Sequence, residues 1–319
     1  MKIISPVDNL AECGALIAAG ADELYGGYVT PAWEATFSLL TSLNQRTFAT
    51  AQISSRDELV GIIDQAHTAG IRFNLTLNAP FYTDEQIPYL LDYVADAVST
   101  GIDGLILADL SLLRSVRKRF PEVELQASTL AHIGNSLSAR VYASAGLSRM
   151  ILPRHIPVNE IADIVQSCPD IEFDVFMLVG KCPNTEGLCT FHHSSPDRAW
   201  PCEIPYDIEP MREDVPEAFA RIIANQSSWS LTDRRHGCGL CAVPALQQAG
   251  IHGVKLVGRG APGRQKIKNI QLAKDFIKLA AAAEDFGSYR KKAMAAHHDR
   301  FGSPCSPNVC YYPEYYLPD

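Results

Sequence analysis

One unit recurs along the sequence and constrains the fold more than any other feature. A helical pattern of apolar residues runs into a small residue and a glycine, and a short strand rich in Val, Ile and Leu follows. Each glycine stands where the end of a helix needs a left-handed residue. Strands of this composition are typical of parallel sheets that are covered on both faces. The unit recurs around Gly20, Gly70, Gly101, Gly146 and Gly250.

The number of these units predicts the fold class. Eight alternating strands and helices most simply close into a (β/α)8 barrel of the TIM type. The alternative is an open doubly wound sheet, but no GxGxxG motif follows the first expected strand to indicate a dinucleotide site. We expect one domain over residues 1–290 and a Pro/Tyr-rich tail over 291–319. The expected strands cover 2–7, 23–28, 72–78, 104–109, 124–129, 149–154, 173–179 and 253–259, with a further apolar piece at 229–233.

A long irregular segment, about residues 180–228, breaks this rhythm and carries cysteines. A connection of this length in a compact domain indicates a functional loop. Cys182 follows an expected strand end, so a barrel would place it at the C-terminal face, where barrel active sites lie. Cys189 and Cys202 belong to the same loop, and Cys238 and Cys241 follow the piece at 229–233. The sequence therefore predicts that five cysteines converge at one rim of the barrel.

Thiols in this arrangement have three chemical interpretations. An iron–sulfur cluster tolerates wide and varied spacing between its cysteines. A structural zinc site usually has two short-spaced pairs, and here only "CGLC" has the short spacing. A thiol redox pair at "CGLC" is the third interpretation, and the alternative to all three is a set of unligated buried thiols. Cys13 and Cys168 lie in helical patterns as ordinary buried thiols, and we assign no role to Cys305 and Cys310.

Polar residues at other expected strand ends are candidates for substrate binding. Arg154 and Arg259 end two strands, and arginine binds carboxylates in a bidentate way. Tyr25 and Gln126 lie on other strands, and His193 lies in the Cys-rich loop, where acid/base work would require it to be within hydrogen-bond reach of a substrate. An arginine or glutamine at such a position serves equally well to join strand ends.

The charge and the apolar content of the chain argue against some classes of partner and location. The net charge of −8 and the pI near 5.6 argue against a surface that coats nucleic acid, so we expect nucleic acid to be an unlikely partner. No stretch approaches the roughly 18 apolar residues that a membrane span needs. The first residues lack the pattern of a signal peptide, which predicts a cytoplasmic protein, and a reducing cytosol disfavours disulfides.

The cysteine-bearing segment resembles the signature of the U32 family, known as collagenase-like peptidases. The match is "DVFMLVGKCPNTEGLC", with Asp174, Cys182, Gly187 and Cys189 in register. A third family cysteine corresponds to Cys202 after "PDRAWP". The closing "KIEGR" of the family appears as "KLVGR", which ends at Arg259. The similarity covers roughly residues 1 to 275 in the right order.

A fourth family cysteine precedes a helix that here reads "VPALQQAGI", which leaves Cys238 and Cys241 as candidates. The register of Ala249 and Gly250 favours Cys238. The resemblance implies that four of these cysteines bind a [4Fe-4S] cluster, with zinc as the alternative metal.

The resemblance also implies oxygen-independent hydroxylation, of the ubiquinone ring or of RNA bases in better-understood members. We expect redox or hydroxylation chemistry on a small molecule, with a prephenate-like oxygen donor and a homo- or heterodimer with a related U32 subunit. The alternatives are a U32 peptidase and a zinc- or cluster-binding scaffold without catalytic activity.

Overall fold

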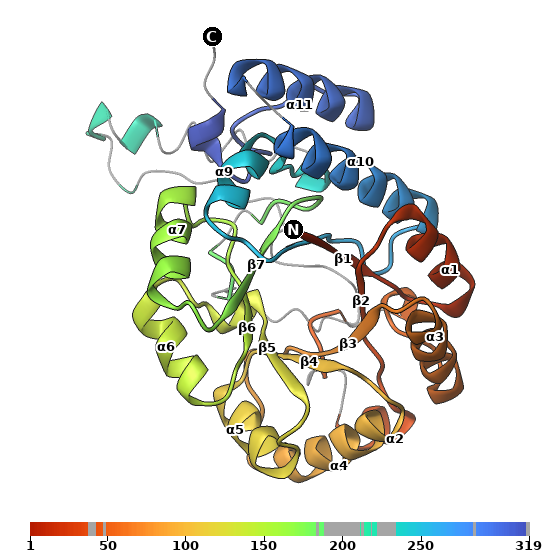
Figure 1. Cartoon of the computed structure of the whole chain (residues 1–319). Coiled ribbons are helices and arrows are strands. Elements are labelled where there is room, and N and C mark those ends of the chain that lie inside the picture. Colours follow the sequence, from red (N-terminus) through yellow and green to blue (C-terminus); the bar gives the residue numbers. More distant parts are fainter. Residues whose placement is uncertain are drawn as a thin grey trace.

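The fold is a closed barrel of eight parallel strands inside a ring of helices (Figure 1). The computed structural model describes residues 1–37, 43–46, 49–182, 185–187, 211, 214–217, 219–221, 234–282 and 285–316. Each strand pairs in parallel with its neighbours in the chain, and β8 pairs with β1 to close the barrel. The predicted (β/α)8 barrel is confirmed, and the open sheet is excluded. The strands are β1 Lys2–Pro6, β2 Glu23–Gly26, β3 Arg72–Leu77, β4 Gly104–Leu107, β5 Glu124–Ala127, β6 Arg149–Ile151, β7 Glu172–Phe176 and β8 Gly253–Lys255.

The helices form a ring around the barrel (Figure 1). All five glycines of the recurring unit have φ between 72° and 112°, which explains why glycine ends these helices. The apolar piece at 229–233 lies outside the described residues. None of the described helices combines the length and the apolar character that crossing a lipid bilayer requires. The helices are α1 Leu10–Ala19, α2 Pro31–Thr36, α3 Arg56–Thr68, α4 Gln86–Ser99, α5 Leu110–Arg119, α6 Ser136–Ser144, α7 Val158–Ser167, α9 Val243–Gln248, α10 Gly263–Ala281 and α11 Phe286–Phe301.

The two faces of each strand differ in chemistry. Residues that face the helices are apolar and fully buried, as Leu75 on β3 and Val254 on β8 show. Residues that face the barrel interior include many polar side chains, so the interior is a polar layer rather than an apolar core. Two glycines make room for it. A Cβ at Gly104 would lie 2.6 Å from Asn74 Oδ1, and one at Gly253 would lie 2.6 Å from Asp174 Oδ1.

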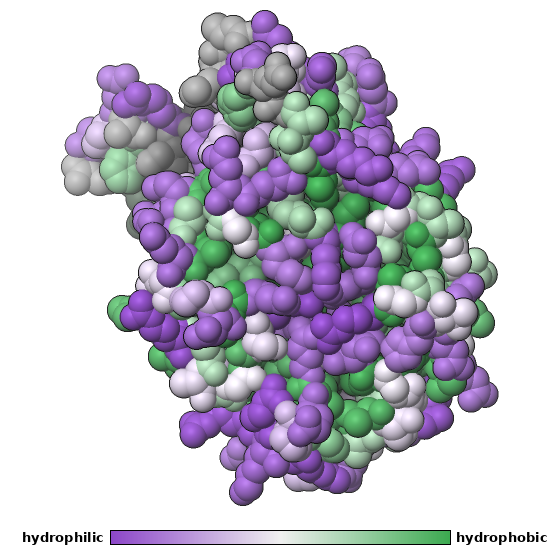
Figure 2. Space-filling model, viewed as in Figure 1, coloured by the Kyte–Doolittle hydropathy of each residue, from purple (hydrophilic) through white to green (hydrophobic). Residues whose placement is uncertain are grey.

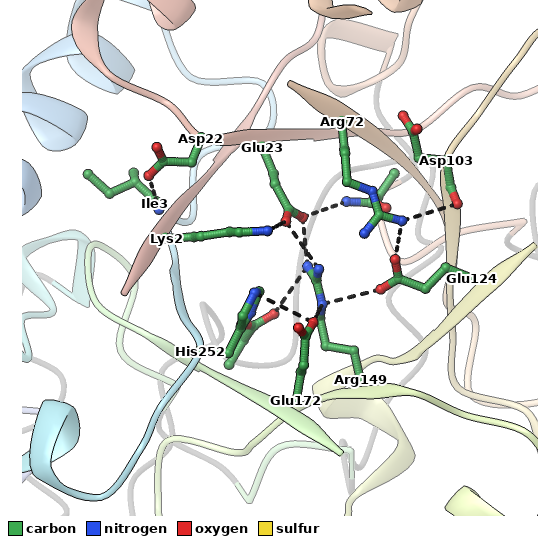
Figure 3. Close-up of polar contacts among 12 residues, drawn as sticks. Lys2, Ile3, Asp22, Glu23, Arg72, Asp103, Glu124, Arg149, Glu172 and His252 are labelled. Carbon is green, nitrogen blue, oxygen red and sulfur yellow. Dashed lines mark hydrogen bonds and ion pairs between the residues drawn. The ribbon is translucent and has the colours of Figure 1, made fainter. Parts of the chain in front are cut away.

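Arg149 on β6 is the centre of this polar layer (Figure 3). Its guanidinium donates to both carboxylate oxygens of Glu23, at 2.6 and 3.1 Å. Its Nε lies 3.2 Å from Glu124 and 3.0 Å from Glu172. Arg149 and Glu23 are each 1% exposed, so the bidentate pair is removed from solvent. Seen from the side of Figure 1, hydrophilic side chains gather over the centre of the ring of helices (Figure 2).

Glu23 makes the layer sensitive to acid. Burial by itself raises the pKa of this carboxyl, but the hydrogen bond and charge of Arg149, and then those of Lys2, lower it from 4.5 to about 2. Because the pKa is lower in the folded protein, ionised Glu23 stabilises the fold above about pH 4.5. We expect this stabilisation to be lost as the pH falls from about 4.5 to about 2. Urea unfolding across this range should show a weaker pH dependence for Glu23→Gln, and an unchanged dependence would contradict the assignment.

The tail returns to the end of the barrel that carries cysteines. Cys238 donates its backbone N–H to Val309, at 2.9 Å, and accepts from Tyr311, at 2.8 Å. Lys181 donates from Nζ to the carbonyl of Cys310, at 2.7 Å. These bonds hold residues 309–311 against the segments that follow β7 and precede α9.

Candidate functional site

The described cysteines of the candidate site lie beyond the C-terminal end of β7. Leu178, two residues past β7, pairs with Cys238 in an isolated β-bridge. Cys182 follows a few residues later, and Cys241 stands in the 3-10 helix Leu240–Ala242 beside Cys238. The charges of Cys182 and Cys238 both act on the buried Tyr311. Cys189, Cys202 and His193 lie outside the described residues.

Cys238 and Cys241 are protonated when no metal binds them. Burial raises the pKa of Cys238 far above its ordinary value, and burial and Cys310 raise the pKa of Cys241 to about 12. A metal centre displaces such protons, because thiolate is the ligand form of cysteine. The backbone N–H of Leu240 points at Cys238 Sγ, at 3.4 Å, as it does for ligating thiolates. In the part of the chain that the structure describes, no group of three or more His, Cys, Asp or Glu is placed to hold a metal ion.

Arg154 anchors the Cys-rich loop instead of standing free at the strand end. Its guanidinium pairs with Glu186 and stacks on Phe176, with Cζ 3.7 Å from the ring centroid. Glu186 also accepts from the backbone N–H of Arg154, at 2.7 Å. The ring of Tyr311 lies on the guanidinium as well, at 5.2 Å. Glu186 lies between Cys182 and Cys189 in sequence, so this ion pair holds residues 185–187 close to the barrel.

Arg259 joins three segments at the barrel mouth. It donates to Thr76 Oγ1 at 3.0 Å, to Asn44 Oδ1 at 2.8 Å and twice to the carbonyl of Ala51, at 2.8 and 3.2 Å. A Cβ at residue 27 would lie 2.3 Å from Nη2, so the close approach of this guanidinium requires Gly27. Every nitrogen of Arg259 is thus hydrogen-bonded within the protein.

Gln126 and Tyr25 are also held by protein partners. Gln126 donates to Asn74 and to Glu124, at 3.0 Å in each case, and it is 2% exposed within the polar layer. Tyr25 donates to the carbonyl of Leu256, at 2.7 Å, and is 5% exposed. Both side chains join strands in this structure, and a role of either in binding substrate stays a prediction.

Three side chains at this end were not singled out from the sequence. Glu186 and Tyr311 hold Arg154, and neither stands in a regular element that would have marked it. Lys255 is the last residue of β8 and faces the barrel interior. Lys255 is part of the motif "KLVGR". A lysine in an otherwise apolar strand was the signal in the sequence that could have marked it as a site residue.

Comparison with known proteins places the chain in a family. The profile of Peptidase family U32 matches residues 8–312. The chain belongs to peptidase family U32. A solved structure, that of the U32 peptidase Mk0906, is similar with a TM-score of 0.50 and 13% identity, over 82% of this chain and 94% of that one. This structural likeness confirms the fold of the U32 chain.

Curated relatives of this U32 chain carry names from two kinds of chemistry. The tRNA hydroxylation protein P of Haemophilus influenzae is 28% identical over 59% of this chain and 38% of its own length. The 23S rRNA 5-hydroxycytidine C2501 synthase of Escherichia coli is 24% identical over 81% of this chain and 36% of its own length. The Collagenase of Porphyromonas gingivalis is 23% identical over 81% of this chain and 61% of its own length. The U32 chain therefore spans less than half of either RNA-modifying relative.

These relatives overturn one expectation about partners. The prediction that nucleic acid is an unlikely partner is wrong, because the relatives are named for tRNA and 23S rRNA hydroxylation. The prediction failed because net charge averages over the whole surface. Residues 263–301, which contain α10 and α11, hold nine Lys and Arg against four Asp and Glu in a chain of net charge −8.

Proposed function

We propose that this U32 chain is an iron–sulfur protein that takes part in oxygen-independent hydroxylation of RNA. The observation that carries the proposal is the similarity to relatives named for hydroxylation of tRNA and 23S rRNA. One of these alignments extends over 81% of this chain. We also propose a cytoplasmic location, where the thiols that the site needs stay reduced.

The proposed cofactor is a [4Fe-4S] cluster held by Cys182, Cys189, Cys202 and Cys238. Two observations on the described residues support this cofactor. Cys182 and Cys238 lie at the same end of the barrel, and the backbone N–H of Leu240 points at Cys238 Sγ. Protonated, buried thiols are poor nucleophiles, which disfavours a thiol peptidase based on Cys238 or Cys241. A bound cluster would supply electron transfer at the barrel mouth.

The basic side chains of α10 and α11 are the proposed contact with the RNA backbone. The two helices lie together on one side of the barrel, and α5, which carries another basic run, lies on the opposite side (Figure 1). Among the described residues, the exposed cations of α10 and α11 have no ion-pair partner, so their charge is available to phosphate groups. These cations are Arg264, Lys268, Lys278, Lys291 and Lys292.

Charge reversal on α11 tests this contact. We expect Lys291→Glu/Lys292→Glu to weaken binding of a tRNA transcript and to reduce the slope of log K against log salt by about 0.7–0.9 per lysine. Fluorescence anisotropy across a salt series measures both quantities. The matched control is Arg114→Glu/Lys118→Glu on α5, whose side chains are equally exposed. Equal losses in the two variants would show that only overall charge matters and would remove the assignment to α11.

A separate experiment tests the proposed RNA hydroxylation. Mass spectrometry of nucleosides from total RNA should show the loss of a hydroxylated nucleoside when the gene is deleted. Its return on expression of the wild-type chain, and not of a Cys182→Ser variant, would support the proposal. An unchanged nucleoside profile in the deletion strain would refute it.

A further inference from the structure

Lys255 is a lysine inside the barrel that has no acidic partner. It is 7% exposed, and its backbone pairs with Ile4 on β1 and Phe176 on β7. Its Nζ lies 4.0 Å from the centroid of the Tyr25 ring. Among the residues that the structure describes, this ammonium group has no hydrogen bond and no ion pair. Buried lysines are almost never left in this state.

A second buried lysine shows the usual arrangement. Lys266 on α10 is 2% exposed, and its Nζ lies 2.5 Å from Asp8 and 2.6 Å from Glu12. Two carboxylates thus replace the water that Lys266 loses. Lys255 loses as much water and gains only an aromatic ring, which is a weak substitute for a carboxylate.

The two carboxylates whose charges act on Lys255, Asp174 and Glu23, already contact other side chains. Asp174 on β7 lies 2.9 Å from His252 and 3.8 Å from Arg149. Glu23 on β2 is bound by Arg149 and by Lys2, as described for the polar layer. The charges of Arg259 and Arg149 also act on Lys255, and they oppose its protonation.

These surroundings favour the neutral amine. Burial is the largest influence and lowers the pKa of Lys255 to about 7; the charge of Asp174 acts against it, and those of Arg259 and Arg149 act with it. A large fraction of this amine is therefore unprotonated at neutral pH, whereas an exposed lysine is almost wholly protonated. A neutral amine in an apolar, water-poor position is the form that attacks carbonyl carbon.

Its location suits such chemistry. Lys255 ends β8, so it faces the C-terminal end of the barrel, where loops and the cysteine-bearing segments gather. The Tyr25 ring lies beside its Nζ, Phe176 is its register partner on β7, and both residues are almost fully buried.

We propose that Lys255 is a nucleophilic amine that forms an imine with an aldehyde or ketone bound at the mouth of the barrel. The nitrogen of Lys255 adds to the carbonyl carbon, a carbon–nitrogen double bond forms, and the carbonyl oxygen leaves as water with the two amine protons. The step needs neither oxidant nor reductant. This inference is independent of the RNA-hydroxylation proposal and stands or fails separately from it.

Reductive trapping tests the amine. The full chain is incubated with glyoxylate and cyanoborohydride between pH 6 and pH 10, and the labelled lysines are located by peptide mass spectrometry. At pH 7 we expect Lys255 to be labelled at least about tenfold faster than exposed Lys268 and Lys291, because far more of it is unprotonated. Its rate should level off above pH 8, while the rates at the exposed lysines continue to rise.

Two further measurements make the result decisive. Lys255→Met keeps the length of the side chain beside Tyr25 and should abolish the fast label, with the fold checked by circular dichroism. If that variant does not fold, the pH profile of the wild-type chain decides alone. Labelling of Lys255 only after denaturation, or a Lys255 rate that follows those of the exposed lysines, would show a structural cation and overturn the proposal.

Discussion

Replacing Arg149 with methionine is expected to lower the free energy of unfolding by about 3–5 kcal/mol, the usual cost of breaking a buried ion pair. Methionine fills similar space but leaves Glu23, which is 1% exposed, without its bidentate partner. Glu124 and Glu172 lose the same cation, so several carboxylates then repel one another inside the barrel. Equilibrium urea unfolding followed by circular dichroism measures the loss.

An exposed arginine provides the control for this experiment. Arg119 pairs with Asp92 at 3.1 Å on the surface, where the two side chains are 47% and 78% exposed. Arg119→Met should therefore change stability by less than about 1 kcal/mol. A similarly small effect of Arg149→Met would show that the polar layer contributes little to holding the strands together.

Replacing Cys238 with serine is expected to remove the iron of the protein, whereas Cys241→Ser should retain it. Cys238 is joined to the end of β7 through the bridge to Leu178, and the N–H of Leu240 points at its sulfur. Cys241 lies one helical turn further on and is half-buried. Iron and acid-labile sulfide of anaerobically purified protein, together with visible absorption, give the measurement.

Each of these two variants is the control for the other, because each removes one of the two thiols of "CGLC" and leaves the other in place. Loss of iron in Cys241→Ser with retention in Cys238→Ser would exchange their roles. Retention of full iron content in both would mean that neither holds the cluster. Wild-type protein that contains zinc and no iron would replace the cluster with the zinc alternative.

The fold was predictable because its signal is local. A glycine such as Gly20 or Gly146 marks where a helix ends, and the apolar run after it marks a strand, so both can be read within about ten residues. Their repetition is enough to count the strands of a barrel.

The site was only partly predictable because its contacts join distant segments. Arg149 and Glu23 are 126 positions apart, and Arg259 and Asn44 are 215 apart, so neither contact has a local pattern. Arg154 and Arg259 lie three and four residues beyond β6 and β8, and the sequence does not reveal that protein groups occupy them. The isolation of Lys255 depends on where Asp174 and Glu23 find their partners, and only the packed barrel shows that.

The pairing of Cys238 with residues 309–311 has a consequence for biosynthesis. All eight strands leave the ribosome before this segment does, so the barrel can close while the cysteine-bearing end is still open. Any inorganic centre can be loaded into that opening while the tail is still unmade. Residues 309–311 then pair with Cys238, so we expect insertion of such a centre to be easier before this pairing forms than after it.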